Sequence, residues 1–561
     1  MNTQKWLVVF LIISLMLSGC APKAAATRVA EVTRQQAEKP KAAPTVVAAQ
    51  PTQAPMAEPE RIGEQNPPEE RSPLSPTTLP LSTSAPVAGN QPNPSGRAPR
   101  DNYFQDYGVN PEIDTRRDHL STFALDVDTA SYTLMRKYIN DGYLPPFDAV
   151  RVEEFVNYFD PGYPNPEKIG FAIYADGAPS PYLEDREAPF EGEIILRFGI
   201  QGYQVSENER KPVALTLLVD TSGSMSYSGR IDLVKDALKL LVERLRPDDS
   251  VAIVAYSRTS KVVLNPTRTR DQRRILKAID QLSPGGSTNL EAGLNLAYQL
   301  AMENFRPEAE NRVILCSDGV ANVGNINPDT LLEEIHGYVD EGISLSSYGF
   351  GMGNYNDVLL EQMADRGDGQ YAYVDDRDEA ERLFVENLTS VLTVIGKDAK
   401  VQVDFNPDVV ETYRLLGYEN RAVADQDFRN DAVDAGEIGA GQRAVALYTV
   451  KLRPEAEGRI ATVQLRWRDA ETDENHEING NFNTWNLAQN FEDADPRYQL
   501  AVVVAMYAEI LRESPWVAGY TLRDLQHEAR RVAGLLPGDD DVTEFAHLVA
   551  QAVKISRRAT E

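Results

Sequence analysis

Expected strands and helices alternate between residues 211 and 395, and this alternation constrains the fold more than any other feature of the chain. The run at 213–219, VALTLLV, is continuously apolar, which is typical of a strand buried on both faces. Further strands are expected at 251–256, 313–317 and 343–350, and helices at 231–245, 271–282, 290–303, 328–341, 355–365 and 377–393. The pattern predicts an α/β fold with a doubly wound, mostly parallel sheet and helices on both faces.

Side chains that carry oxygen follow the carboxyl ends of these strands. Asp220, Ser222 and Ser224 come directly after the first strand, Thr288 precedes a helix, and Asp318 follows the third strand. Because ligands of open α/β sheets bind at the carboxyl ends of strands, we expect these side chains to converge on one rim. Two carboxylates and three hydroxyls suit a hard divalent cation, with Mg2+ as the first choice and Mn2+ or Ca2+ as alternatives.

An Asp-x-Ser-x-Ser motif alone is also compatible with a cap on the following helix. Together with Thr288 and Asp318, however, it resembles the complete metal-ion-dependent adhesion site (MIDAS) of von Willebrand factor A (VWA) domains. The resemblance implies that the hydroxyls bind the cation and that the aspartates bind it directly or through water. It also implies that the cation accepts an Asp or Glu from a protein partner. Met225, Tyr227 and Val320 lie near the motif in sequence and are expected to contact that partner.

Other segments resemble bacterial YfbK-type lipoproteins, which carry a central VWA domain. The segments are 120–132, 148–159, 349–357, 416–421 and 434–441. This resemblance implies an architecture much more than it implies a biochemical role.

The amino terminus resembles the signal peptide of a bacterial lipoprotein. Lys5 precedes an apolar run at 6–17, which is short for a membrane-spanning helix and ends in Leu-Ser-Gly-Cys20. The resemblance implies cleavage before Cys20, a lipid on its sulfur, and a body anchored to the cell membrane or outer membrane and exported to the periplasm or cell surface. A plain signal peptide is the alternative. If Cys20 is lipidated, Cys316 has no partner within the chain and is expected to be a small buried hydrophobe.

Residues 21–100 contain 15 of the 35 prolines and no aromatic residue, which predicts a disordered, semi-extended tether. This tether has 9 Lys and Arg against 7 Glu, whereas residues 101–561 have 46 Lys and Arg against 78 Asp and Glu. An acidic body argues against a nucleic-acid partner, since phosphate recognition needs a basic face. It is compatible with a partner that brings a cation or acts through one.

The chain is expected to divide into six parts. They are a signal peptide at 1–20, the tether at 21–100, a family-specific N-terminal region at 101–205, the VWA domain at 206–395, a β-rich domain at 396–495 and a helical region at 496–561. In the β-rich domain, alternating apolar and polar residues predict a small β-sandwich. Its acidic loop at 425–437 departs from the EF-hand pattern and is expected to be a solvated loop.

Two helix starts carry acidic residues that could also suggest metal sites. Asp128 or Thr129 is expected to cap a helix that runs to about residue 139. Asp541 opens a sequence that resembles a capping box before the last helix.

The function favoured by the sequence is cation-dependent binding of an unidentified protein partner. The alternative is a structural scaffold in which the metal only stabilises the fold. Catalysis is not expected, because the metal loops contain no histidine and the chain has neither a GxSxG motif nor a phosphate-binding loop motif.

Overall fold

The structure is a computed structural model that describes residues 44–48, 102–125, 127–166, 170–182, 192–319, 328–353, 355–517 and 519–560. Cys20, Val320 and most of the predicted tether lie outside the described residues. Within the described ranges, no helix combines the length and the apolar character that a membrane span requires.

The sheet of the predicted VWA domain has six strands in the order β11-β10-β9-β6-β7-β8. Their bounds are β6 Val213–Asp220, β7 Ser250–Tyr256, β8 Ser260–Arg268, β9 Glu310–Ser317, β10 Ile343–Phe350 and β11 Tyr371–Val374. All neighbouring strands run parallel except β7 and β8. The predicted mostly parallel sheet is confirmed, and β8 and β11 extend it at the two edges. Because β7 lies on one side of β6 and β9 on the other, the strand order reverses between β6 and β9, where such sheets bind ligands.

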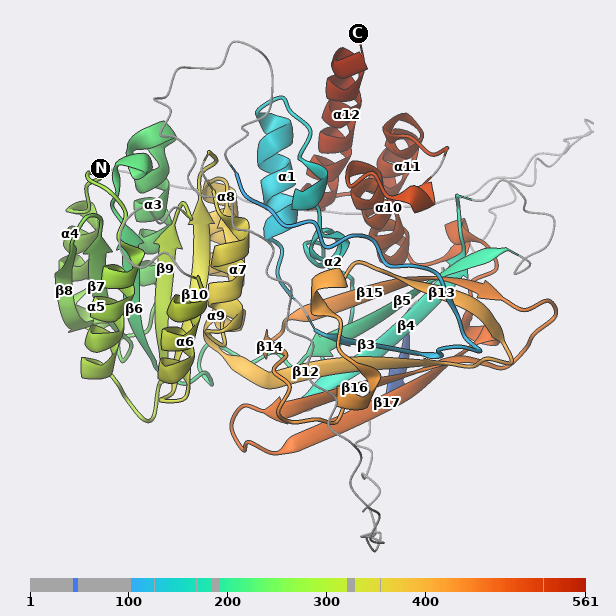
Figure 1. The fold of residues 1–561 in the computed structure, drawn as a ribbon, viewed down its shortest axis with the longest axis horizontal. Helices are drawn as coiled ribbons and strands as arrows, with labels where there is room; N and C mark the ends of the chain where they lie inside the picture. The colour runs from blue at the N-terminus through green and yellow to red at the C-terminus, as the bar shows by residue number, and fades with distance from the viewer. Residues whose placement is uncertain are drawn as a thin grey trace, which may run out of the picture. The chain divides into compact units, whose positions relative to one another are not determined.

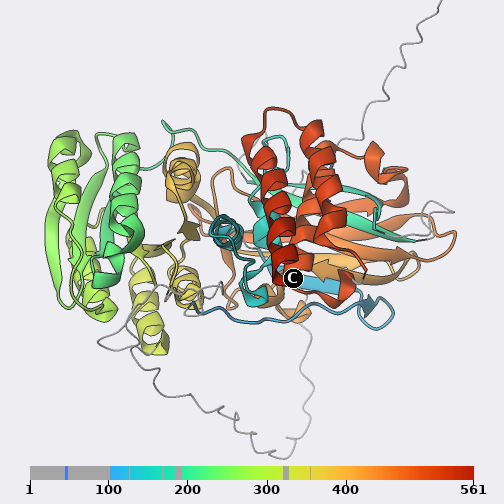
Figure 2. The ribbon, with the colours of Figure 1, turned by 90° about the horizontal axis from the view of Figure 1, so that it is seen from above.

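Helices cover both faces of this sheet (Figure 2). Helices α3 Arg230–Arg244 and α4 Gln272–Asp280 share one apolar core with the sheet. Helices α5 Leu290–Glu303, α6 Pro328–Val339 and α7 Asp357–Asp365 share the core on the other face. The helix expected at 377–393 is divided into α8 Arg377–Glu381, a π-helical turn at Arg382–Glu386 and α9 Leu388–Leu392.

A β-sandwich is built from segments on both sides of the VWA domain. One sheet has the order β1-β4-β5-β15-β13-β2, and the other has β14-β12-β16-β17 with β3 beside β12. The bounds are β2 Ile113–Asp114, β3 Leu120–Ala124, β4 Phe171–Pro179, β5 Glu193–Gly202, β12 Val394–Phe405, β13 Val410–Leu416, β14 Gly436–Gly439, β15 Arg443–Leu452, β16 Arg459–Asp469 and β17 Asn475–Asn483. The apolar side chains between the two sheets form one core.

The sandwich differs from the expected division into separate regions at 101–205 and 396–495. Strands β4 and β5 lie in the same sheet as β15 (Figure 1), and Gln201 of β5 pairs with Arg443 of β15. The VWA domain is therefore inserted into the sandwich between β5 and β12. Pairing across so many residues leaves no local signal in the sequence.

Four residues inside the predicted tether form strand β1, Thr45–Ala48, which pairs antiparallel with β4. The expectation of disorder from 21 to 100 is therefore wrong at these residues. Two of the four are valines and one is a threonine, which favour strands, and the outer edge of β4 offers backbone groups that need partners.

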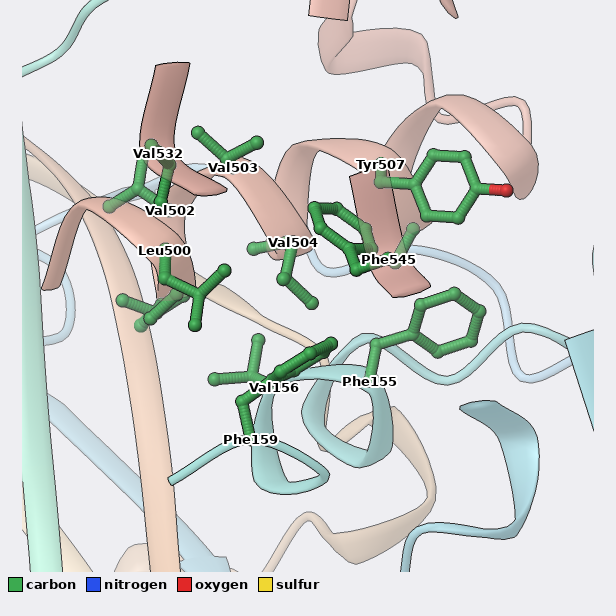
Figure 3. Close-up of a cluster of buried hydrophobic side chains, with 14 of the residues drawn as sticks. Phe155, Val156, Phe159, Leu500, Val502, Val503, Val504, Tyr507, Val532 and Phe545 are labelled. Atoms are coloured by element: carbon green, nitrogen blue, oxygen red, sulfur yellow. The ribbon is translucent and has the colours of Figure 1, made fainter. Parts of the chain in front are cut away.

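Three C-terminal helices pack together with a short N-terminal helix. They are α10 Pro496–Leu511, α11 Leu522–Leu535 and α12 Asp540–Thr560, and the short helix is α2 Val152–Asn157. Figure 3 shows Phe159, which follows α2, together with Tyr507 of α10 and Phe545 of α12. The ring of Phe545 lies 5.6 Å from that of Phe159 and 5.5 Å from that of Tyr507. The helical region is thus joined to the N-terminal region by an aromatic core.

The cap of helix α1, Ala130–Asn140, is not the one predicted. Thr129 occupies the N-cap position, but its side chain makes no capping hydrogen bond. The backbone N–H of Ser131 instead donates to Glu154 at 2.7 Å. Asp128 accepts a hydrogen bond from the backbone N–H of Tyr371 at 3.2 Å, so its carboxylate binds β11 instead.

The predicted cap of α12 is displaced by two residues. Asp539 accepts a hydrogen bond from the backbone N–H of Val542 at 3.1 Å, so Asp539 performs the role expected of Asp541. Asp541 already lies within the first helical turn.

Candidate metal centre

The two aspartates of the predicted site lie at the ends of the neighbouring strands β6 and β9. Val219 pairs with Cys316, so Asp220 and Asp318 follow the paired residues at the same rim of the sheet. Both side chains are fully buried. This position is the point at which the strand order reverses.

Hydrogen bonds hold the Asp220 carboxylate in place. Its Oδ1 accepts from the backbone N–H of Ser222 at 2.7 Å. Its Oδ2 accepts from the hydroxyls of Ser317 at 3.1 Å and Tyr256 at 3.3 Å. Burial and the negative charge of Asp318 raise the pKa of Asp220 to about 7. A buried pair of carboxylates of this kind is stabilised by a cation.

The hydroxyl groups come from two loops that are hydrogen-bonded to each other. The Oγ atoms of Ser222 and Ser224 lie 2.8 Å apart. The backbone N–H of Gly223 donates to the carbonyl of Gly286 at 2.8 Å, which holds this loop against the one that carries Thr288. Strand ends and loop contacts thus bring Asp220, Ser222, Ser224 and Asp318 to one rim, with the loop of Thr288 held against it. This set of oxygens is chemically suited to a hard cation.

Arg230 was not identified from the sequence, yet it binds one of the two carboxylates. Its Nη1 lies 2.8 Å from Asp318 Oδ2, and it also donates to the carbonyl oxygens of Ser224 at 3.4 Å and of Met352. A Cβ at Gly351 would fall 2.2 Å from Arg230 Nε, so the glycine makes room for the guanidinium. One sequence signal was available: an arginine that opens a helix opposes the helix dipole.

We expect Arg230→Gln to tighten Mn2+ binding roughly tenfold, because the substitution removes a cation that competes for Asp318. Isothermal titration of the full chain measures the affinity. Arg244→Gln, at the exposed far end of α3, is the matched control and should leave the affinity unchanged. Equal or weaker binding by the Arg230 variant would show that the guanidinium does not compete with the ion.

Three residues were expected to contact a partner, and for Met225 this prediction is wrong. Its side chain is fully buried and packs in the core shared by the sheet and α3. Proximity in sequence did not reveal its direction, because within the same irregular 3-10 turn at 223–229 Met225 is buried whereas Tyr227 is exposed. Tyr227 is 52% exposed and is free to contact a partner. Val320 lies outside the described residues.

Comparisons with known families agree with the arrangement of the chain. Residues 214–388 match the von Willebrand factor type A domain, and residues 98–188 match a family described as von Willebrand factor. Residues 390–459 and 451–555 match the C-terminal domain of the uncharacterized protein YfbK.

Individual relatives include two uncharacterized bacterial proteins. The chain is 36% identical over 430 residues to the uncharacterized protein YfbK of Escherichia coli K12, covering 74% of this chain and 73% of the relative. It is 25% identical over 281 residues to the uncharacterized protein sll0103 of Synechocystis, covering 49% of this chain and 66% of that protein.

Among solved structures, a von Willebrand factor type A protein from Catenulispora acidiphila matches with a TM-score of 0.39 and 16% identity, over 65% of this chain and 87% of that one. The extent of the match to the E. coli protein, together with the matched domains, shows that the chain belongs to the YfbK family, with a central VWA domain and a YfbK C-terminal domain.

Proposed function

We propose that this protein is a lipid-anchored envelope protein that binds a protein partner through a divalent cation on its VWA domain. The observation that supports this most is the meeting of Asp220 and Asp318 with the paired hydroxyls of Ser222 and Ser224 at one rim. Mg2+ is the first choice of ion, and Mn2+ and Ca2+ are alternatives.

Each residue of the rim has a role in this proposal. Ser222, Ser224 and Thr288 offer hydroxyl oxygens, and Asp220 and Asp318 offer charge and orient the other ligands. When bound, the ion supplies a positive centre that accepts a carboxylate from an Asp or Glu of the partner. The exposed ring of Tyr227 offers aromatic area beside the site, and aromatic residues are enriched among the energetically dominant contacts of interfaces.

The anchor in this proposal is a lipid on Cys20, with the folded body in the periplasm or at the cell surface. One acyl chain gives marginal, reversible membrane binding, so several chains are needed for a stable anchor. Cys316, the other cysteine, is fully buried in the VWA core, and burial raises the pKa of its thiol above the usual range. Its surroundings are therefore those of a structural residue and not of a reactive one.

A scaffold with a purely structural metal is the second candidate, and one observation favours it. Arg421, from the sandwich, pairs with Asp365 at 2.9 Å and Glu361 at 3.4 Å in the VWA domain. A VWA domain held in this way suits a fixed component of a complex. We propose no catalytic activity, because the loops that carry the site contain no histidine to act as a general base.

Affinity capture from native membranes in Mg2+ and in EDTA separates the two candidates. If the cation accepts a partner carboxylate, partners captured by the wild-type chain in Mg2+ are lost in EDTA and lost with Asp220→Asn. Capture that is equal in Mg2+ and EDTA, with the protein folded in both, would support the scaffold and contradict the proposed function.

A further inference from the structure

A second group of carboxylates lies where the VWA domain meets the sandwich. Asp368 belongs to the loop that precedes β11, whereas Asp434 precedes β14 and Glu437 lies within it. One carboxylate oxygen from each residue lies within 4.8 Å of the other two. Oxygens bound to one Ca2+ ion at roughly 2.3–2.6 Å are at most about 5 Å apart, so this spacing fits a shared ion. Since β11 runs parallel to β10, the group lies at the end of the sheet opposite the rim that carries Asp220 and Asp318.

Glu437 is the member that points to a ligand. The residue as a whole is 9% exposed, whereas Asp368 is partly buried and Asp434 is exposed. Among the residues that the structure describes, it makes no hydrogen bond and no ion pair, although its carboxylate faces those of Asp368 and Asp434. Carboxylates buried to this extent are normally paired or bound to a metal. Burial, followed by the charges of Asp368 and Asp434, raises the pKa of Glu437 well above its usual range.

The balance of charge around the group also favours a cation. Two neighbouring carboxylates are already neutralised, since Asp365 pairs with Arg421 at 2.9 Å and Asp398 pairs with Arg468 at 2.7 Å. Among the described residues, one member of the group forms an ion pair: Asp368 lies 3.1 Å from the ammonium of Lys397. Arg366 also acts electrostatically on Asp434. Three carboxylates against these cations leave the group net negative, and a divalent cation would neutralise that charge.

Both loops are held rigidly by close backbone contacts. Asp368 has a positive φ of 47° and lies between two glycines. A Cβ at Gly369 would fall 1.9 Å from the carbonyl oxygen of Leu345, and one at Gly436 would fall 1.9 Å from that of Leu125. No larger residue fits at either glycine without a backbone shift. The carboxylates are therefore brought together by the fold and not by flexible side chains alone.

We propose that Asp368, Asp434 and Glu437 bind a Ca2+ ion that ties the VWA domain to the β-sandwich. Ca2+ takes six to eight oxygens in irregular geometry, so backbone carbonyls and water complete the shell around three carboxylates. Mg2+ demands a near-octahedral arrangement and dehydrates reluctantly, which suits this junction less. Sites in extracellular modules bind Ca2+ with dissociation constants of about 0.1–1 mM, and we expect the same range. Asp434 and Glu437 were expected to belong to a solvated acidic loop, and Glu437 departs from that expectation by its burial.

The test is a calorimetric titration of the full chain with Ca2+ in an Asp220→Asn background, which removes the rim site from the measurement. We expect one Ca2+ ion to bind and Glu437→Gln to weaken it at least about tenfold. Glu457→Gln, the same change at an exposed position of the sandwich, is the control and should bind as the parent does. In EDTA, Glu437→Gln should unfold at the same urea concentration as the parent or a higher one, because glutamine fits the site without a buried charge.

A second measurement uses the wild-type chain and does not depend on the background variant. Ca2+, but not the same concentration of Mg2+, should slow amide hydrogen exchange in peptides that cover 365–370 and 434–439. Absence of Ca2+ binding up to about 10 mM, or equal binding by the Glu437 and Glu457 variants, would overturn the proposal. Exchange that Ca2+ leaves unchanged at both segments would overturn it as well.

Discussion

Asp220→Asn should lower the affinity of the full chain for Mn2+ at least about 100-fold. The substitution removes one of the two carboxylates at the rim and changes the hydrogen bonds that orient Ser222. Isothermal titration with Mn2+ or Mg2+ measures the change. Asp248→Asn, an exposed aspartate of the same domain, is the matched control. Equal affinity of the Asp220 variant and the wild type would contradict the assignment of the metal site to this rim.

The same variant should be more stable than the wild type when no metal is present. The pKa of Asp220 is about 7 in the folded chain and 3.8 in the reference state, so the folded state binds more protons between these values. Wild-type stability should therefore fall as the pH rises from about 4 to about 7, by on the order of 3–4 kcal/mol. Asparagine carries no charge to bury, so the advantage of the variant should appear at pH 8 and vanish near pH 4. Urea unfolding in EDTA at both pH values measures it, and an advantage independent of pH would contradict the assigned pKa.

Arg151→Met should lower the free energy of unfolding by about 3–5 kcal/mol. Arg151 is nearly fully buried, with its Nη1 2.7 Å from Asp357 and its Nε bound to Glu154. The variant leaves these carboxylates buried without their cation, and a third one, Glu361, lies 3.7 Å from the same guanidinium. Asp357 opens α7 shortly after Met352, whose carbonyl oxygen accepts from Arg230, so the loss should loosen the support of the rim as well.

Urea unfolding followed by circular dichroism measures this effect. Arg443→Met is the control, because Arg443 and its partner Asp160 are both substantially exposed and such pairs contribute at most about 1 kcal/mol. Arg151→Lys should fall between the wild type and Arg151→Met, since it keeps one charge but loses the fork of donors. Equal midpoints for the Arg151→Met and Arg443→Met variants would show that the buried network does not stabilise the fold.

The VWA sheet was predictable because its signals are local. The run at 213–219 is apolar throughout, and the helices that follow have the periodicity of half-buried helices. The rim residues were equally predictable from the sequence, because Asp220 and Asp318 each follow a strand and the ends of parallel strands meet at one edge of the sheet. The edge strand β8 was missed because lysine, asparagine and arginine interrupt its pattern.

Features that depend on distant segments were not predictable. The sandwich joins β5 to β15 across the whole VWA domain, and no local pattern encodes this pairing. The position of Arg230 on Asp318 depends on the space that Gly351 leaves, which is a property of the folded rim. The direction of Met225 depends on the turn geometry, and its burial became evident only in three dimensions.

The central claim is that the rim of the VWA domain binds a divalent cation. Crystals of the full chain grown in Mn2+, measured at a wavelength near the manganese absorption edge, test it most directly. We predict an anomalous peak within bonding distance of the hydroxyls of Ser222 and Ser224, with Arg230 displaced from Asp318. A rim without an anomalous peak, with Arg230 still bound to Asp318 at millimolar Mn2+, would contradict the account.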